Sequence, residues 1–385
     1  MARRLPLQHF LFPVLAPLSM LYGAGAKLKR AAYAHGISSG WRPPKFCVSV
    51  GNISWGGTGK TPVVDWLLNW CESNNIKAAV LTRGYRSKPP CLPFTVQYSS
   101  SPEECGDEPL MLAKKHPESA ILVDPERQRA GKKAMEERTP DIFILDDGFQ
   151  HLRVQRDINL VLLDKDDVFI SPRKGSPKSS WNLVMPAGTW REPQGALSAA
   201  DVFLIKTTPE EWPGLVPDLQ ARLQAWNRPV FAFCMSATNL RPLNGAKQLL
   251  SHRQMGPYLF ATGIGCPEQA LSTAAAFLES SPACTAFFPD HHDFRREKDW
   301  LEAKGIPLVC TEKDAVKIER LNLSIPCYAL ETSAKFFASL CPGNNENDSC
   351  LDFAAWLQMH WHEHQQKKAD FLKQTDSGYE KKRIF

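Results

Sequence analysis

The sequence predicts an α/β protein built on a parallel sheet, with a second, smaller α/β domain, and three observations support this. Short apolar runs at 78–81, 120–123 and 142–145 alternate with helical patterns, which is typical of βαβ units. A glycine-rich stretch follows the apolar run 46–50, as at a strand-to-helix turn. The chain has 385 residues, of which 43% are hydrophobic and 23% charged, so it can form two globular domains with sizeable cores.

The N-terminal end of the chain is cationic, because its first 64 residues contain no Asp or Glu. Such a surface suits an anionic partner, either a phospholipid surface or a nucleic acid. Residues 10–26 are apolar, but this run contains two prolines and is shorter than the ~20 residues that a spanning helix needs. We therefore interpret residues 1–40 as an interfacial segment that lies on a membrane and is rimmed by Lys27, Lys29 and Arg30. A spanning helix, a secretory signal and an ordinary core helix are the alternatives.

The stretch that follows the first apolar run reads Gly-Gly-Thr-Gly-Lys-Thr and predicts a phosphate-binding P-loop. Glycines let consecutive backbone N–H groups point inward, and the helix behind them adds its positive N-terminal end. Ser54 replaces the first glycine of the general pattern, and glycines inside the loop would supply the lost flexibility. The alternative is a glycine-rich turn that binds nothing. The expected nucleotide-binding residues are Gly56, Gly57, Thr58, Gly59, Lys60 and Thr61.

Carboxylates follow the strand expected at 142–145. Asp146 and Asp147 have the arrangement of a Walker-B acid, which holds Mg²⁺ opposite the P-loop hydroxyl of Thr61. Adjacent side chains point in different directions, so we expect one of the two aspartates to face the metal directly. A turn with an Asp cap is the alternative. Asp107 lies in a Gly-Asp-Glu-Pro turn, where composition alone leaves a helix cap and a functional acid equally open.

The second half of the chain repeats the pattern of strands. The run 201–205 ends the first sheet, and a new series begins at 229–233, which predicts a second, smaller parallel sheet. We therefore expect a P-loop domain at 41–225 and a second α/β domain at 226–340. Residues 341–385 would form a C-terminal helix that docks on the first domain or lies on the surface, followed by a charged, disordered tail from Asp376.

Metal sites other than that for Mg²⁺ are not favoured. The eleven cysteines contain no C-x-x-C pair, which indicates reduced, mostly buried thiols and gives no sign of zinc. Residues 290–293 (Asp-His-His-Asp) and the pair His360 and His364 offer metal ligands. Four adjacent residues rarely converge on one ion, however, and a docking helix or an amphipathic surface helix is the more ordinary interpretation of the pair.

Nine motifs occur in an order that resembles one known family, the tetraacyldisaccharide 4'-kinases (lipid A 4'-kinases) of Gram-negative bacteria. The most specific is Asp-Asp-Gly-Phe-Gln-His at 146–151, in combination with the P-loop. The resemblance runs from the N-terminal segment to about Lys317 and does not cover the tail after Cys341. The motifs lie at 50–52, 56–62, 83–85, 106–109, 146–151, 186–193, 262–265, 288–292 and 311–315.

The resemblance implies a kinase that moves the γ-phosphate of ATP to the 4'-hydroxyl of tetraacyldisaccharide 1-phosphate, giving lipid IVA. It implies ATP and Mg²⁺ as cofactors and a place at the cytoplasmic face of the bacterial inner membrane. The expected partners are the lipid substrate and the membrane surface, with no nucleic acid and no obligate protein partner. A soluble P-loop kinase or NTPase acting on a small molecule, and a nucleotide-gated adaptor without catalysis, are the alternatives.

The resemblance also implies roles for individual residues. The family's catalytic aspartate matches Asp107, and its partner histidine best matches His291, with His292 as the fallback because the doubled histidine leaves the register open. Asp107 would accept the proton of the sugar hydroxyl, and Lys60 with Mg²⁺ would neutralise charge on the phosphoryl oxygens. We expect Asp107 and His291 on opposite walls of a cleft between the two halves. Three arginines are candidate phosphate contacts or else ordinary surface residues: Arg83, Arg127 and Arg191.

Overall fold

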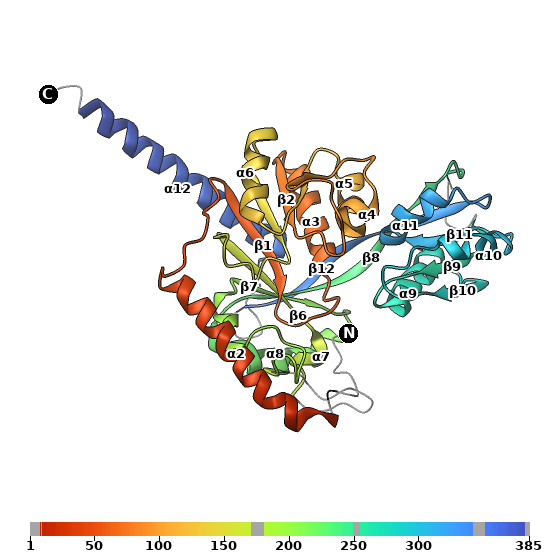
Figure 1. Ribbon diagram of the computed structural model, residues 1–385, viewed down its shortest axis with the longest axis horizontal. Coiled ribbons are helices and arrows are strands. Elements are labelled where there is room, and N and C mark those ends of the chain that lie inside the picture. The colour runs from red at the N-terminus through yellow and green to blue at the C-terminus, as the bar shows by residue number, and fades with distance from the viewer. Residues whose placement is uncertain (1–7, 9, 171–180, 249–254, 342–350, 382–385) are drawn as a thin grey trace.

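The structure, a computed structural model, describes residues 8, 10–170, 181–248, 255–341 and 351–381, and beyond residue 370 it describes the backbone alone. Its strands form one twelve-stranded sheet in the order β10-β9-β11-β12-β8-β7-β6-β1-β5-β2-β4-β3 (Figure 1). The strands are β1 (Phe46–Asn52), β2 (Ala78–Thr82), β3 (Phe94–Thr95), β4 (Ala120–Val123), β5 (Ile142–Asp146), β6 (Ile158–Leu163), β7 (Val202–Lys206), β8 (Val230–Leu243), β9 (Leu259–Thr262), β10 (Cys284–Phe287), β11 (Leu308–Thr311) and β12 (Cys327–Leu340).

Helices connect and cover these strands. The α-helices of the described residues are α2 (Phe12–Ala34), α3 (Lys60–Ser73), α4 (Pro102–Cys105), α5 (Asp107–Lys115), α6 (Arg127–Glu137), α7 (Lys165–Val168), α8 (Trp212–Leu223), α9 (Pro267–Leu278), α10 (Lys298–Glu302), α11 (Glu312–Ile318) and α12 (Phe353–Lys381). Short 3-10 turns include η4 (Arg295–Glu297) and η5 (Glu319–Leu321). Every strand predicted in the first half is present, and β1 lies between β5 and β6 with parallel pairing on both sides. The carboxyl ends of these strands therefore meet at one edge, as the prediction requires.

The second half is a smaller α/β unit, as predicted, but its sheet is not separate from the first. β8 and β12 have 14 residues each and pair antiparallel along their length, with two register shifts. Strands of that length span roughly 45 Å, enough to belong to both halves. β8 joins β7 of the first half, while β12 joins β11 of the second (Figure 1). The prediction of a second sheet was wrong because β8 continues beyond its buried start through a partly buried stretch that ends in the exposed Thr238 and Asn239, and so lacks the continuous apolar pattern of a buried strand.

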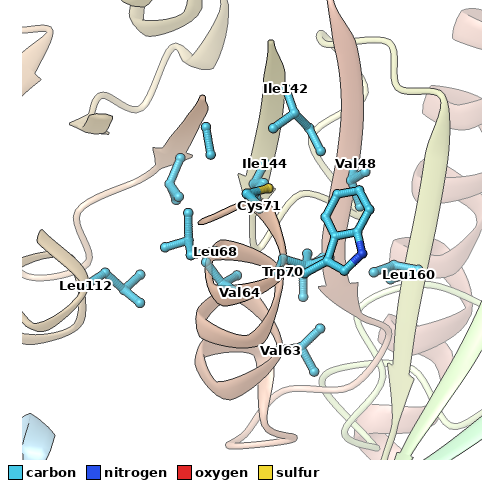
Figure 2. Packing of buried hydrophobic residues seen from close by; sticks show 14 of the residues in the cluster. Val48, Val63, Val64, Leu68, Trp70, Cys71, Leu112, Ile142, Ile144 and Leu160 are labelled. Carbon is cyan, nitrogen blue, oxygen red and sulfur yellow. The ribbon is translucent and has the colours of Figure 1, made fainter. Parts of the chain in front are cut away.

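The main core lies between α3 and the centre of the sheet. Figure 2 shows side chains of α3 facing those of the strands, among them Val63, Val64, Leu68, Val48, Ile142, Ile144 and Leu160. A parallel sheet must bury such apolar faces under helices, which explains why its strands read as continuous apolar runs. This packing fixes α3, and with it the loop that precedes α3, relative to β1.

The C-terminal helix α12 docks on the first half at its start and extends away from the body at its end (Figure 1). Phe353, Trp356 and Leu357 join the main core, and the Phe353 ring lies 5.2 Å from that of Phe231. These contacts agree with the docking interpretation. The helix continues to Lys381, so the prediction of a disordered tail from Asp376 was wrong for residues 376–381. Residues 382–385 lie outside the described residues.

Most cysteines of the described residues follow the prediction, and Cys341 does not. Nine are free, and five of these are buried, which fits reduced thiols. Cys341 takes part in a disulfide bond, so the prediction of reduced thiols does not hold there.

α2 is a 23-residue helix that touches the rest of the protein along a narrow line. Ser19 and Gly23 are its buried residues, with the Ser19 hydroxyl accepting the backbone N–H of Ala187 at 2.8 Å. None of the helices in the described ranges combines the length and the apolar character needed to cross a membrane.

Candidate active site

The predicted P-loop connects the end of β1 to the start of α3. Gly56 and Gly59 have φ angles of 112° and 97°, which L side chains rarely adopt. A Cβ atom on Gly59 would lie 3.0 Å from the Phe233 ring, so this position needs glycine for space as well. Ser54, which replaces the first glycine of the pattern, is buried and forms an antiparallel bridge with Trp190. The position at which the sequence departs from the P-loop pattern is therefore the point where the loop pairs with the segment that contains Trp190.

Lys60 lies between the loop and the Walker-B acids. Its ammonium is 3.2 Å from the side-chain oxygen of Asn52, at the end of β1, and 3.5 Å from Oδ1 of Asp147. Thr61 follows in the first turn of α3, partly buried. The structure thus brings together the predicted lysine and one predicted acid.

The two aspartates point in different directions. Asp146 ends β5 and accepts the hydroxyl of Thr82 at 2.8 Å, whereas Asp147 turns with φ 50° toward Lys60 and Arg191. Burial, followed by the charge of Asp147, raises the pKa of Asp146. Burial would raise the pKa of Asp147 as well, but the charges of Lys60 and Arg191 outweigh it and lower that pKa. Two adjacent carboxylates and the nearby Thr61 hydroxyl are the hard oxygen ligands that suit Mg²⁺.

Two of the three candidate arginines contact these acids. Arg191 donates to both oxygens of Asp147, at 2.9 and 3.0 Å. Arg127 is buried and donates to the backbone oxygen of Asp146 at 3.3 Å. Arg83 is exposed, but its charge contributes to lowering the pKa of Arg127, for which burial is the main cause. The structure therefore groups Arg127 and Arg191 around the Walker-B acids and leaves Arg83 open to solvent.

Asp107 begins α5, and elements of the second half hold one of its oxygens. Oδ2 accepts hydrogen bonds from Nδ1 of His291 and from Nζ of Lys317, both at 2.9 Å. Oδ1 receives no hydrogen bond from the part of the chain that the structure describes. Burial would raise the pKa of Asp107, but the bonds from His291 and Lys317 outweigh it and lower that pKa. The carboxylate is held charged, with one oxygen fixed and the other available.

The tautomer of His291 follows from its other neighbour. Lys313 Nζ lies 3.4 Å from Nε2 of His291, and an ammonium can only donate. Nε2 is therefore the acceptor, and Nδ1 carries the hydrogen that Asp107 receives. His291 has φ 68°, which is uncommon outside glycine and typical of strained functional positions. His292 turns away, with Nε2 at 2.8 Å from Glu297 Oε2. Of the two adjacent histidines, His291 is the one that contacts Asp107.

Comparison with known proteins assigns the chain to a family. The family model described as tetraacyldisaccharide-1-P 4'-kinase (LpxK) matches residues 11–341. The tetraacyldisaccharide 4'-kinase of Oleidesulfovibrio alaskensis is 42% identical over 358 residues, which are 93% of this chain and 97% of that protein. The enzyme of the same name from Nitratidesulfovibrio vulgaris is 44% identical over 328 residues, 85% of this chain and 90% of that protein. The chain belongs to the tetraacyldisaccharide-1-P 4'-kinase family.

A solved structure of this kinase family agrees with the fold. LpxK from Aquifex aeolicus, in complex with ATP, superimposes with a TM-score of 0.66 at 27% sequence identity. The match covers 86% of this chain and 95% of the other. The range matched by the kinase family model includes the P-loop, the Walker-B acids, Asp107 and His291. The resemblance seen in the sequence is therefore confirmed at the level of family and fold.

Lys317 is the residue at this site that sequence reasoning missed. It lies on α11, one helical turn after Lys313, and only 9% of its side chain is exposed. The available signal was the spacing of two lysines at i and i+4, with Lys313 inside the kinase-family motif at 311–315 and Lys317 two residues after it. That spacing places both ammonium groups on one face of α11, and they meet the carboxylate of Asp107 and the imidazole of His291.

The structure gives little support to the two alternative metal sites, residues 290–293 and the pair His360 and His364. Among the described residues, one group of potential ligands converges, formed by His292, Asp293 and Glu297, and exposed acidic groups of this kind are common without a metal. His291 is not a member of that group, because it faces Asp107. His360 is hydrogen-bonded to the backbone oxygen of Trp356, and the ring of His364 packs against Phe46. The pair on α12 therefore serves the docking of that helix.

Proposed function

We propose that this chain transfers the γ-phosphate of ATP to the 4'-hydroxyl of tetraacyldisaccharide 1-phosphate and that Asp107 is the general base. The observation that carries the proposal is the carboxylate of Asp107, charged, fixed through Oδ2 and open at Oδ1. A sugar hydroxyl is a poor nucleophile until a base takes its proton in the transition state. In this proposal Oδ1 accepts that proton, while His291 and Lys317 orient the carboxylate through Oδ2.

The chain that follows β2 connects the proposed base to the Walker-B acids. Thr82 donates to Asp146, and three residues later the ring of Tyr85 lies 5.9 Å from that of His291. Three residues span at most about 11 Å. The segment after β2 therefore contacts both a Walker-B acid and the histidine that holds Asp107, which supports one shared site for the acceptor hydroxyl and the phosphate.

The remaining residues prepare the phosphate donor. Lys60 would neutralise negative charge that accumulates on the β- and γ-phosphate oxygens, and the backbone N–H groups of the loop would hold the β-phosphate. Bound Mg²⁺ supplies further charge neutralisation, with Thr61 and one or both of Asp146 and Asp147 as its protein ligands. Arg191, paired with Asp147, and Arg127, behind Asp146, fix these acids and are candidate phosphate contacts.

Transfer of labelled γ-phosphate from ATP to purified tetraacyldisaccharide 1-phosphate in mixed micelles tests the proposal. We expect a labelled lipid product, and none from the matched acceptor that lacks the 4'-hydroxyl. Release of labelled inorganic phosphate with no labelled lipid would instead indicate a soluble NTPase, the alternative interpretation.

We also propose that α2 holds the enzyme at the cytoplasmic face of the inner membrane, where a tetraacylated substrate resides. Much of the apolar surface of α2 is exposed, including Met20 at 77% and Leu21 at 71%. At its C-terminal end, Arg30 forms a bidentate ion pair with Glu192, with both distances 2.8 Å, and also reaches the backbone oxygen of Phe149. The helix is therefore fastened to the segment that follows the Walker-B acids, which supports delivery of a membrane lipid to this site.

Substituting Met20 and Leu21 together by glutamate is expected to lower binding to vesicles of phosphatidylethanolamine and phosphatidylglycerol at least about tenfold. Burying one such side chain in lipid is worth roughly 1.5–3 kcal/mol, and 1.4 kcal/mol is tenfold in affinity. Vesicle sedimentation measures the change. Trp300→Glu, on α10 at the far end of the molecule, is the matched control and should bind as the natural protein does (Figure 1). Equal sedimentation of the double variant and the control would contradict a membrane role for α2.

Lys317→Met is expected to move the acid limb of the pH–rate profile to higher pH. The ammonium of Lys317 helps to keep the pKa of Asp107 low, and the base acts only when deprotonated. Removing that charge raises the pKa, so activity is lost at a higher pH than in the natural enzyme. Lys317→Arg, which keeps the charge, should shift the limb less. An unchanged acid limb in Lys317→Met would show that Lys317 is merely structural.

A further inference from the structure

Lys206 is a partly buried lysine at the edge of the sheet where the P-loop opens, and the mechanism above does not use it. It is the last residue of β7, at the carboxyl end of that strand. Its ammonium forms no hydrogen bond or ion pair with any residue that the structure describes. Lys165, which follows the adjacent strand β6 at the same edge, is by contrast paired with Glu211 at 2.6 Å.

The stem of Lys206 lies against the P-loop itself. A Cβ atom built on Gly59 would be 3.5 Å from Cδ of Lys206, so the methylene chain passes beside the residue that caps α3. Nζ is one methylene and one bond beyond Cδ. The ammonium is therefore within a few ångströms of the loop.

The two lysines approach the loop from opposite sides of β1. In the order β7-β6-β1-β5, Lys206 comes from β7, whereas Lys60 is directed toward Asp147 after β5. Cys266, at the start of α9 in the second half, is near enough to interact electrostatically with Lys206. Lys206 thus lies where the first half, the P-loop and the second half come together.

An ammonium removed from water without a counter-charge is costly, so proteins usually pair it. Burial is the main cause that lowers the pKa of Lys206, and the charge of Lys165 adds to the lowering. Among the residues that the structure describes, no carboxylate pairs with it. A position that keeps such a cation beside a phosphate-binding loop is suited to an anion supplied by the ligand.

We propose that Lys206 is a second phosphate-binding lysine of the nucleotide site, which contacts a phosphate oxygen of ATP from the β7 side of the P-loop. The inference rests on the proposed nucleotide site and adds a residue that none of the sequence motifs contains. In the absence of nucleotide, Lys206 contributes an unpaired charge. In its presence, the same charge forms a charge-assisted hydrogen bond to phosphate.

Equilibrium binding of ATP and adenosine to the full-length Lys206→Met variant tests this proposal. A hydrogen bond to a charged group contributes enough for the loss to weaken ATP binding roughly ten- to a hundredfold. Adenosine, which has no phosphate, should bind equally well to the variant and to the natural protein. Lys206→Arg should recover part of the affinity for ATP. Lys165→Met is the matched control and should bind ATP normally, because Lys165 already has a partner.

Thermal unfolding separates ligand binding from a structural role. Without nucleotide, Lys206→Met should have a Tm equal to or above that of the natural protein, since an unpaired charge is removed; with saturating ATP its Tm should rise less. A lower Tm without nucleotide, together with unchanged ATP affinity, would overturn the inference and make Lys206 a structural residue.

Lys60→Met, measured in the same ATP-binding assay, distinguishes a failure of the inference about Lys206 from a failure of the proposed nucleotide site. If Lys60→Met loses ATP affinity and Lys206→Met retains it, the inference about Lys206 fails and the nucleotide site stands. If Lys60→Met binds ATP normally, the nucleotide site itself is wrongly placed, and the inference about Lys206 fails with it.

Discussion

Asp107→Asn is expected to lower turnover by about 10²- to 10⁴-fold, the usual contribution of a general base. The amide has the shape of the carboxylate and can still accept the hydrogen of His291 Nδ1, but it cannot take a proton from the substrate hydroxyl. Lys317 would then face a neutral group across a bond that measures 2.9 Å in the natural protein. KM for ATP should change little, because no phosphate contact is removed. Steady-state kinetics with the lipid acceptor measure both quantities.

Glu108→Gln is the matched control for this substitution. Glu108 is the next residue on α5 and pairs with Lys313 at 2.7 Å, so it also carries a charge across the contact between α5 and α11. Its loss should change turnover only a few-fold, since it does not receive the proton. Circular dichroism and thermal unfolding should show both variants folded. Normal turnover of a folded Asp107→Asn variant would mean that another group, or water, takes the proton.

The nucleotide side of the site could be predicted from the sequence because its signals are local. A strand, a glycine turn and Lys-Thr follow one another within 16 residues, and Asp146 and Asp147 directly follow a buried strand. Parallel pairing of β1 with β5 then forces the two segments together. Pattern and topology agree at these positions, so the contact between Lys60 and Asp147 needed no knowledge of distant parts of the chain.

The acceptor side could not be predicted from local patterns, because its partners are far apart in the sequence. Asp107 and Lys317 are separated by 210 positions, and Asp107 and His291 by 184. Composition alone left Asp107 undecided between a helix cap and an acid, and only the family resemblance pointed to His291. The antiparallel pairing of β8 with β12 joins the two halves in one sheet, and neither the length of β8 nor the presence of β12 was predicted. Because that pairing was not predicted, the contacts of Lys313 and Lys317 with His291 and Asp107 could not be predicted either.

Lys60→Met is expected to lower turnover by roughly 10²- to 10³-fold, comparable with the loss of one preorganised group that stabilises transition-state charge. Lys60 is 3.5 Å from Asp147 and 3.2 Å from Asn52, so its ammonium is already placed beside the loop before nucleotide arrives. Methionine has a similar length and no charge, so the substitution removes the electrostatic contribution and leaves the packing of α3 largely intact. Single-turnover transfer of γ-phosphate, measured at saturating ATP, separates this effect on chemistry from weaker binding.

Two further variants decide whether charge near the phosphates is what matters. Lys77→Met removes an exposed lysine just before β2, at the opposite, amino edge of the sheet, and should be neutral in the same assay. Lys60→Arg keeps the charge, but a planar guanidinium cannot replace a compact ammonium in a close-fitting loop, so recovery should be slight. Full activity of Lys60→Met at saturating ATP would assign Lys60 to ground-state binding alone and leave the neutralisation of the transferred phosphate to Mg²⁺ and the arginines. A loss in Lys60→Met that persists at saturating ATP, with Lys77→Met unaffected, requires that the ammonium act on the phosphoryl group during transfer.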